Sequence, residues 1–161
     1  MTASKPASLR LVQGVILLAG ALVLATAVDR ATLSFFWTPL VLGLTYLVAA
    51  AAGGREGGYW ATALPLTGWG LAVVWIGEVR PEDVDIAGAY LAGTGLGLTA
   101  AAVLASRGVP IATAGLAATV AAAGLILAFS PRADALTDAT TYAIAVGAVG
   151  AVNVARGLLG R

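Results

Sequence analysis

Long apolar runs alternate with short polar segments along the whole chain. Each run is about 20 residues long, which is enough for a helix to cross the hydrocarbon core of a bilayer. The predicted spans are residues 9–28, 32–53, 59–77, 86–105, 109–129 and 139–159. The pattern predicts an all-α, polytopic membrane protein in which six transmembrane helices form one compact domain over residues 9–161. The polar residues 1–8 are expected to form a short cytoplasmic tail.

The first run has two interpretations. Its apolar part is short, and Ala25-Thr26-Ala27 matches the small-residue pattern of a signal-peptide cleavage site. It is also long enough for an ordinary first helix, and alanine triplets arise easily in so alanine-rich a chain. We favour the uncleaved helix, and both interpretations keep the N-terminus on the cytoplasmic side during insertion.

The third run is the most informative, because tryptophans lie near both its ends. Trp60 and Trp75 are separated by about 22 Å at 1.5 Å per residue, and tryptophan prefers the two membrane interfaces. The run leads into Glu78–Asp85, which holds four carboxylates and one arginine in eight residues. This segment lacks the spacing and the glycine of a helix–loop–helix calcium site. We interpret it as a solvated outer loop.

The basic residues predict the orientation of the bundle. With a cytoplasmic N-terminus, six basic residues lie inside: Lys5, Arg10, Arg55, Arg107, Arg156 and Arg161. Three lie outside: Arg30, Arg80 and Arg132. This excess follows the positive-inside rule, so both termini are predicted to be cytoplasmic.

Small residues are the predicted helix-packing sites. Gly93 and Gly97 form a small-xxx-small pair in the fourth run, and Gly147 and Ala151 form another in the sixth. Small side chains let helix backbones approach closely, which matters in lipid because no hydrophobic force pushes the helices together.

Three further residues in the spans are candidates for a functional role. Pro65 removes the backbone hydrogen bond to the Ala61 carbonyl, so it is a candidate hinge or cavity wall, or a proline simply tolerated there. The hydroxyl of Thr62 or Thr67 is expected to compensate in part. Tyr46 and Asn153 are candidates to line a polar vestibule, or to join helices by hydrogen bonds.

Two residues mark predicted helix starts. Pro110 suits the first turn of the fifth helix, where its missing N–H is not needed. Asp138, or Thr137, is the predicted N-cap of the sixth helix.

The regular loop spacing is compatible with two internal repeats. Arg30–Arg55, Arg80–Arg107 and Arg132–Arg156 span similar lengths, as three helical hairpins of about 50 residues would. Two inverted halves of three helices each, as in many transporters, fit the same spacing. Regular loops in any six-helix protein give both patterns, and residue identities support neither strongly.

Composition narrows the chemistry. Only 11% of residues are charged, against roughly a quarter in soluble domains, and 60% are hydrophobic. The net charge of +1 argues against nucleic acid. The chain has no Cys and no His, which makes haem, copper and zinc chemistry unexpected, so no cofactor and no metal are predicted. One Lys against eight Arg suggests a G+C-rich prokaryotic genome, and hence the prokaryotic plasma membrane.

Three hypotheses of function follow, in order of preference. The first is a non-enzymatic helical bundle that serves as a structural or accessory subunit, packing with itself or with a larger membrane complex. The second is a small channel or transporter for a neutral or apolar solute, which requires a pore or cavity. The third is an enzyme that uses outer carboxylates such as Glu78 and Asp83. Asp, Glu, Lys, Arg and His are absent from the interior of the spans, which counts against proton-coupled transport. No stretch carries a motif that names a family.

Overall fold

The computed structural model describes residues 7–28, 33–82, 84–129 and 138–159, and within these ranges every regular element is helical. The α-helices are α1 (Ala7–Val23), α2 (Thr38–Ala52), α3 (Trp60–Val74), α4 (Ile86–Ser106), α5 (Thr113–Phe129) and α6 (Ala139–Leu158). Short 3₁₀ turns cover Phe35–Trp37 and Gly54–Glu56. The prediction of an all-α protein with six principal helices is confirmed for the part of the chain described.

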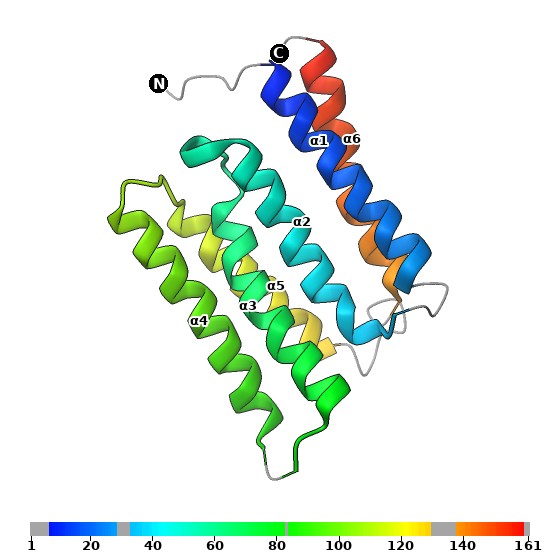
Figure 1. The fold of residues 1–161 in the computed structure, drawn as a ribbon, viewed down its shortest axis with the longest axis vertical. Coiled ribbons are helices and arrows are strands. Elements are labelled where there is room, and N and C mark those ends of the chain that lie inside the picture. The colour runs from blue at the N-terminus through cyan, green and yellow to red at the C-terminus, as the bar shows by residue number, and fades with distance from the viewer. Residues whose placement is uncertain (1–6, 29–32, 83, 130–137, 160–161) are drawn as a thin grey trace.

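The helices run alternately up and down, so the first end of α1 and the last end of α6 lie at the same end of the molecule (Figure 1). The turns after α2 and α4 lie at that end too, and the last turns of α3 and α5 lie at the other. The alternation inferred from the apolar runs is therefore present.

Several helix ends are fixed by local chemistry. Asp85 caps α4 by accepting a 2.5 Å hydrogen bond from the Gly88 N–H, and Asp138 caps α6 by accepting a 2.9 Å bond from the Thr140 N–H. The prediction for Asp138 is confirmed. Pro39 lies in the first turn of α2, where no helical donor is lost.

Two helices end in a widened π-helical turn. α1 continues as Leu24–Val28, and α3 continues as Trp75–Val79. The second turn stops at Arg80, which takes a left-handed conformation with φ of 49° while its N–H bonds the Ile76 carbonyl. With these turns, the first and third helices reach 22 and 20 residues.

The fifth helix begins later than predicted, at Thr113 instead of residue 109. The reason is the end of α4: Gly108, with φ of 82°, and Val109 bond back to the carbonyls of Ala105 and Leu104. This is the Schellman arrangement, and it buries Val109 against the bundle. Pro110 therefore lies in the extended connection and not in the first turn of α5, so that prediction was wrong.

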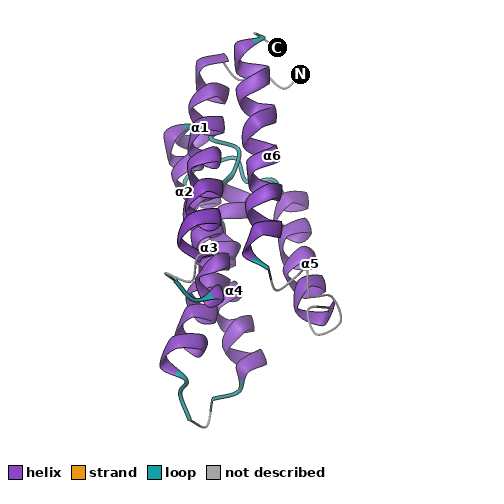
Figure 2. Ribbon diagram, turned by 90° about the vertical axis from the view of Figure 1, so that its right-hand side faces the viewer, coloured by secondary structure: helices purple, strands orange, loops and turns teal. Residues whose placement is uncertain are grey.

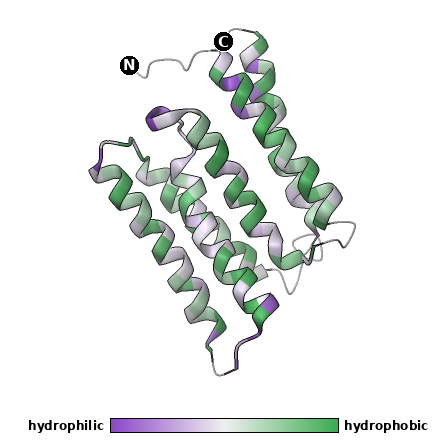
Figure 3. Ribbon diagram, in the orientation of Figure 1, coloured by the Kyte–Doolittle hydropathy of each residue, from purple (hydrophilic) through white to green (hydrophobic). Residues whose placement is uncertain are grey.

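Five helical segments within the described residues are long and apolar enough to cross a membrane. They are Ala7–Val28, Phe35–Ala52, Trp60–Val79, Ile86–Ser106 and Ala139–Leu158, whereas α5 has 17 residues and is the short apolar helix of the set. The ribbon is green or pale along most of each helix, and the strongly hydrophilic residues lie mainly near the helix ends (Figure 3). Large exposed side chains such as Leu91 and Leu96 would be a liability in water. The fold therefore indicates a multi-pass membrane protein.

The helices do not form a closed ring. α1 packs along α6, α2 packs along α3, and α3 lies between α2 and α4. α5 makes its main contact with α3 and does not pack along α6 within the described residues. It stands apart from the row formed by α2, α3 and α4 (Figure 2). A cavity lies on this open side, among α2, α3, α5 and α6.

Candidate functional site

A half-open cavity of about 730 Å³ lies among α2, α3, α5 and α6. Its size falls in the usual range of ligand pockets, roughly 300–1,000 Å³. From Thr38 to Tyr46 it follows α2 over eight residues, about 12 Å at 1.5 Å per residue. Two phenylalanines, Phe35 and Phe36, line the end near the start of α2. The site is therefore an elongated slot parallel to the helices.

The slot exists because α5 and α6 present small side chains to it. From α5 it is lined at helical spacing by Gly115, Ala118, Thr119, Ala122, Ala123 and Ile126. From α6 it is lined by Tyr142, Ala145, Val146 and Val149. Glycine and alanine cannot bridge the space to the opposite helix. Ala118, Ala122 and Ala145 are also exposed, so the slot opens along this side.

The wall formed by α2 and α3 carries two buried polar groups without a hydrogen-bond partner. They are the Thr38 hydroxyl and the Trp69 indole N–H, on side chains 1% and 7% exposed. A buried polar group left without a partner costs about 1–3 kcal/mol. Among the described residues that line the slot, none is charged. The site can therefore hold an uncharged molecule.

The two predicted vestibule residues, Tyr46 and Asn153, are brought together through Tyr59. The rings of Tyr46 and Tyr59 lie 5.5 Å apart between centroids, and the Tyr59 side chain is hydrogen-bonded to Asn153. Asn153 also donates a 2.8 Å bond to the Val149 carbonyl of its own helix. Tyr46 lines the slot, whereas Asn153 does not. The cluster joins α2, α6 and the start of α3 at one end of the slot.

The predicted packing pair in α4 lies directly against α3. A Cβ built on Gly93 would lie 2.5 Å from the Gly68 carbonyl oxygen, and one on Gly97 would lie 2.7 Å from the Pro65 Cα. Real Cβ atoms do not approach backbone this closely. Both positions therefore depend on glycine for the contact between the two helices.

In α6, the closest approach to α1 occurs at other residues than the predicted pair. A Cβ on Gly147 would make an ordinary 3.4 Å contact with Ala21, and Ala151 is exposed. The tight positions are Gly150, 3.0 Å from the Gly14 carbonyl oxygen, and Gly157, 2.9 Å from the Ala7 carbonyl oxygen. The face of α6 that packs tightly against α1 therefore carries Gly150 and Gly157, and not the predicted Gly147 and Ala151.

Pro65 is fully buried within α3 and packs against Gly97 of α4. It also lines a void of about 10 Å³ next to Thr119 of α5. The Thr67 hydroxyl is buried without a hydrogen-bond partner, so it does not compensate for the donor that Pro65 lacks. A Cβ on Gly43 would lie 2.7 Å from this hydroxyl, which places Thr67 in the contact between α2 and α3.

Gln13 is a structural residue that the sequence did not single out. Its side chain is 1% exposed, and its amide nitrogen donates to the carbonyls of Ala49 at 2.8 Å and Gly57 at 2.7 Å. These bonds tie α1 to α2 and to the turn between α2 and α3. A glutamine inside a predicted span was the available signal, because an amide in lipid needs partners from its own protein.

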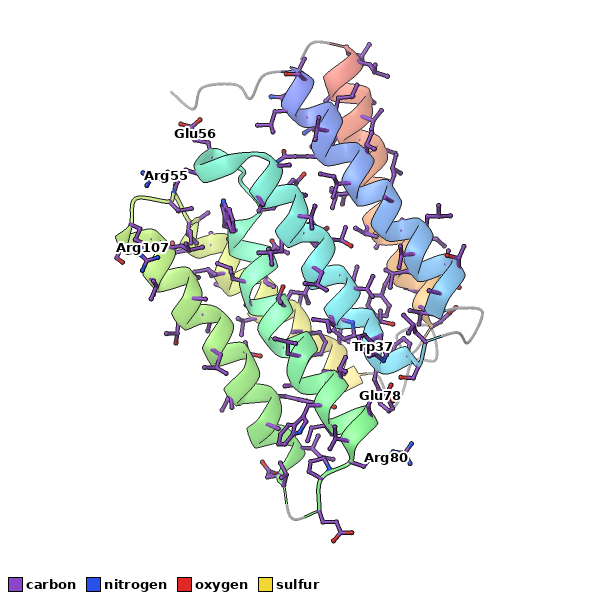
Figure 4. The ribbon with its side chains drawn as sticks, in the orientation of Figure 1. Trp37, Arg55, Glu56, Glu78, Arg80 and Arg107 are labelled. Carbon is purple, nitrogen blue, oxygen red and sulfur yellow. The ribbon has the colours of Figure 1, made fainter. Side chains whose placement is uncertain are left out.

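The carboxylate named in the enzyme hypothesis, Glu78, lies at the opposite end of the molecule from Arg55 and Arg107 (Figure 4). It accepts hydrogen bonds from the Ser34 hydroxyl and, at 3.0 Å, from the Trp37 indole. Asp83 lies outside the described residues. No group of three or more carboxylates suited to a metal occurs in the described part of the chain. Glu78 here joins the π-helical end of α3 to the segment before α2.

The charged side chains are segregated between the two ends. Among the described residues, one end holds four arginines and one glutamate: Arg10, Arg55, Glu56, Arg107 and Arg156. The other end holds one arginine and four carboxylates: Glu78, Arg80, Glu82, Asp85 and Asp138. Charged residues at the two ends, with an apolar region between them, are the pattern typical of a bundle that spans a bilayer.

Comparisons with known proteins give no family for this chain: no protein-family model, no curated protein and no solved structure matches it. The fold and the slot alone define its class. Within the described residues it is a helical bundle with five segments long and apolar enough to cross a membrane, and with an apolar cavity that opens between two of its helices.

Proposed function

We propose that this chain binds and carries a neutral, largely apolar solute in the prokaryotic plasma membrane, without catalysing a reaction on it. The slot of about 730 Å³ is the observation that supports this proposal most directly. Of the sequence-based hypotheses, a channel or transporter was the one that required such a cavity.

The lining favours an uncharged solute. Phenylalanine, leucine, valine and alanine side chains form most of the surface, and the polar groups are hydroxyls and one indole. Moving an ion into such a site costs several kcal/mol unless a counter-charge is present. Both termini are proposed to be cytoplasmic, because the arginine-rich end then meets the cytoplasm.

The test is photolabelling of the purified protein in detergent with a radiolabelled alkyl diazirine. We expect label on the α5 and α6 peptides that line the slot. Ala122→Phe fills the slot with an aromatic ring and should lower labelling about tenfold. Ala121→Phe, on the adjacent exposed residue that does not line the slot, is the matched control and should change labelling less than about twofold. Equal labelling of both variants would contradict the proposal.

A second candidate function is an accessory or structural subunit that packs against itself or a larger complex. The observation that favours it is the outer face of α5, where Ala117, Ala121 and Gly124 leave the backbone uncovered. In lipid, such small-residue faces are typical contact sites for another helix.

This second function is tested by the mass and content of the complex extracted gently from native membranes through a C-terminal tag. A larger partner that co-purifies in fixed ratio, and is lost in an Ala121→Leu variant, would favour the accessory subunit. A monomer of unchanged mass in both forms would exclude it and leave the solute-binding function.

A further inference from the structure

We propose that the slot exchanges its solute sideways with the hydrocarbon core of the bilayer, through the gap between α5 and α6, and that aromatic contacts separate both its ends from water. The solute is then a molecule that dissolves among acyl chains, and not a water-soluble neutral molecule such as glycerol. This inference rests on the proposed solute-binding function and adds the source and the route of the solute.

At the end of the slot nearer the arginine-rich side, three side chains connect α2 to α6. Tyr46 of α2 lines the slot, and its ring centroid lies 5.5 Å from that of Tyr59. Tyr59 directly precedes α3 and is hydrogen-bonded to Asn153 of α6. Tyr46 and Tyr59 also pack against the buried core cluster that includes Leu17 of α1 and Val146 of α6. These contacts bridge the helices at this end.

A second aromatic contact lies at the opposite end of the slot. Phe35, in the turn before α2, and Tyr142, near the start of α6, both line the slot, and their ring centroids lie 6.2 Å apart. Both separations are those of aromatic rings in contact. Phe36, the next residue, also lines the slot and lies directly against Gly77 at the end of the third helical segment. Aromatic side chains therefore connect the helices at both ends.

The long side of the slot, between α5 and α6, is different. These two helices do not pack along each other in the described part of the chain. Ala118 and Ala122 of α5 and Ala145 of α6 line the slot and are exposed, and their methyl groups are too short to reach across. An opening on the side of a membrane bundle faces acyl chains, because the bilayer core holds no water. A solute that uses this opening must dissolve in hydrocarbon.

The test is the accessibility of a nitroxide spin label inside the slot, in protein reconstituted into phospholipid vesicles. The chain has no cysteine, so Leu66→Cys gives one labelling site, on the α3 wall of the slot. Molecular oxygen concentrates in hydrocarbon, whereas the polar complex Ni(II)EDDA stays in water. Leu96→Cys is the matched reference for lipid, since Leu96 is 71% exposed. Its neighbour Gly97 lies against Pro65, the neighbour of Leu66, so both labels lie at a similar depth.

The expected result is a label at Leu66 that resembles one in lipid. Its ratio of oxygen accessibility to Ni(II)EDDA accessibility should match that of the Leu96 label within about twofold, because both meet hydrocarbon. A label at Glu82→Cys, on the exposed loop after the third helical segment, is the reference for water. Its ratio should be at least about tenfold lower, because a polar complex is excluded from hydrocarbon.

Two variants of the Leu66→Cys protein test the ends of the slot. Tyr46→Ala and Phe35→Ala each remove one ring of an aromatic contact, so water can enter from that end. The accessibility of the Leu66 label to Ni(II)EDDA should rise severalfold in each. Leu44→Ala is the matched control, because Leu44 is exposed on α2 and does not line the slot. It should leave the accessibility unchanged.

Three outcomes overturn the inference. High accessibility of the Leu66 label to Ni(II)EDDA without either ring variant shows that water fills the slot. Low accessibility to both oxygen and Ni(II)EDDA shows that the slot does not exchange with the bilayer. Unchanged accessibility in both ring variants removes the role given to the aromatic contacts. Failure of the solute-binding function is distinguished from all three, because it is measured separately, as photolabelling that Ala122→Phe does not change.

Discussion

α3 and α5 are both apolar helices with internal glycines, yet they are held very differently. α3 buries seven residues of its α-helical part and lies between α2 and α4. Over Thr113–Ile126, α5 buries no side chain. Gly68 and Gly70 of α3 are two residues apart, which places them about 200° apart around the helix. Gly68 therefore meets α4 and Gly70 meets α2, whereas a Cβ on Gly124 of α5 would meet nothing within 4 Å. In α3, glycine therefore stands at the contacts with both neighbouring helices, whereas Gly124 of α5 stands at none among the described residues.

The largest expected effect is a difference in stability between a glycine substitution in α3 and one in α5. Gly70→Leu places a Cβ 2.5 Å from the Leu40 nitrogen, so α2 and α3 must move apart. We expect a loss of about 3 kcal/mol or more in unfolding free energy, as for severe overpacking. Gly124→Leu in α5 should change it by less than about 0.5 kcal/mol. Thermal unfolding in detergent, followed by circular dichroism, measures both. Equal losses would mean that α5 is packed as tightly as α3.

A second pair of variants sharpens the comparison within a single helix. Gly97→Leu in α4 would bring a Cβ to 2.7 Å from the Pro65 Cα, and we expect a loss of about 2–3 kcal/mol. Gly95, two residues earlier, would meet nothing within 4 Å, so Gly95→Leu should be nearly neutral. The same unfolding measurement applies. An unchanged melting temperature for Gly97→Leu would show that this face of α4 meets lipid and not α3.

A third test asks whether a hydrogen bond between helices stabilises the protein more than a hydrogen bond within one exposed helix. Gln13→Leu removes two hydrogen bonds that α1 donates, one to Ala49 of α2 and one to Gly57 in the turn before α3. We expect a loss of about 1–3 kcal/mol in unfolding free energy. Thr99→Val on the exposed face of α4 removes only a bond to its own helix, from the hydroxyl to the Gly95 carbonyl, and should change little. The measurement is the melting temperature of each variant, and it should fall more for Gln13→Leu than for Thr99→Val. A larger loss for Thr99→Val would refute the role given to Gln13.

The smallest effect is expected at the exposed end of α3. Glu78→Gln weakens the bonds from Ser34 and Trp37, and we expect a loss of about 1 kcal/mol or less. Because the Trp37 indole changes its partner, the tryptophan emission should shift slightly. Glu82→Gln on the adjoining loop is the charge-matched control. An identical shift for Glu82→Gln would mean that charge alone, and not the contact with Trp37, is responsible.

Much of the fold was predictable, because bilayer thickness fixes the length of an apolar run and polar residues mark its ends. The start of α5 was not, since Gly108 and Val109 end α4 with bonds that no apolar pattern reveals. Four-residue spacing in α6 pointed to Gly147 and Ala151, but Gly150 and Gly157 make the tight contacts. Alanine and glycine are so frequent in this helix that several stripes look alike.

The candidate site was predictable only in part. Tyr46 stood out because a polar residue in a span is rare, and it does line the slot. Trp69 was not singled out, since a tryptophan within a span gives no sign that its N–H will lack a partner. That property depends on which groups of the other helices the fold brings near the indole, and those helices come from distant parts of the chain.

The pairing of α1 with α6 has a consequence for the synthesis of the protein. Gly14 and Gly150, which meet in this pair, are 136 residues apart (150 − 14). At about 5–20 residues per second, the ribosome needs roughly 7–27 s between the two. During that interval, the Gly14 face of the first helix lacks the neighbour that it has in the folded chain. Arrival of the last helix therefore completes the bundle, and a chain that stops before Ala139 keeps the glycine face of α1 open to other proteins.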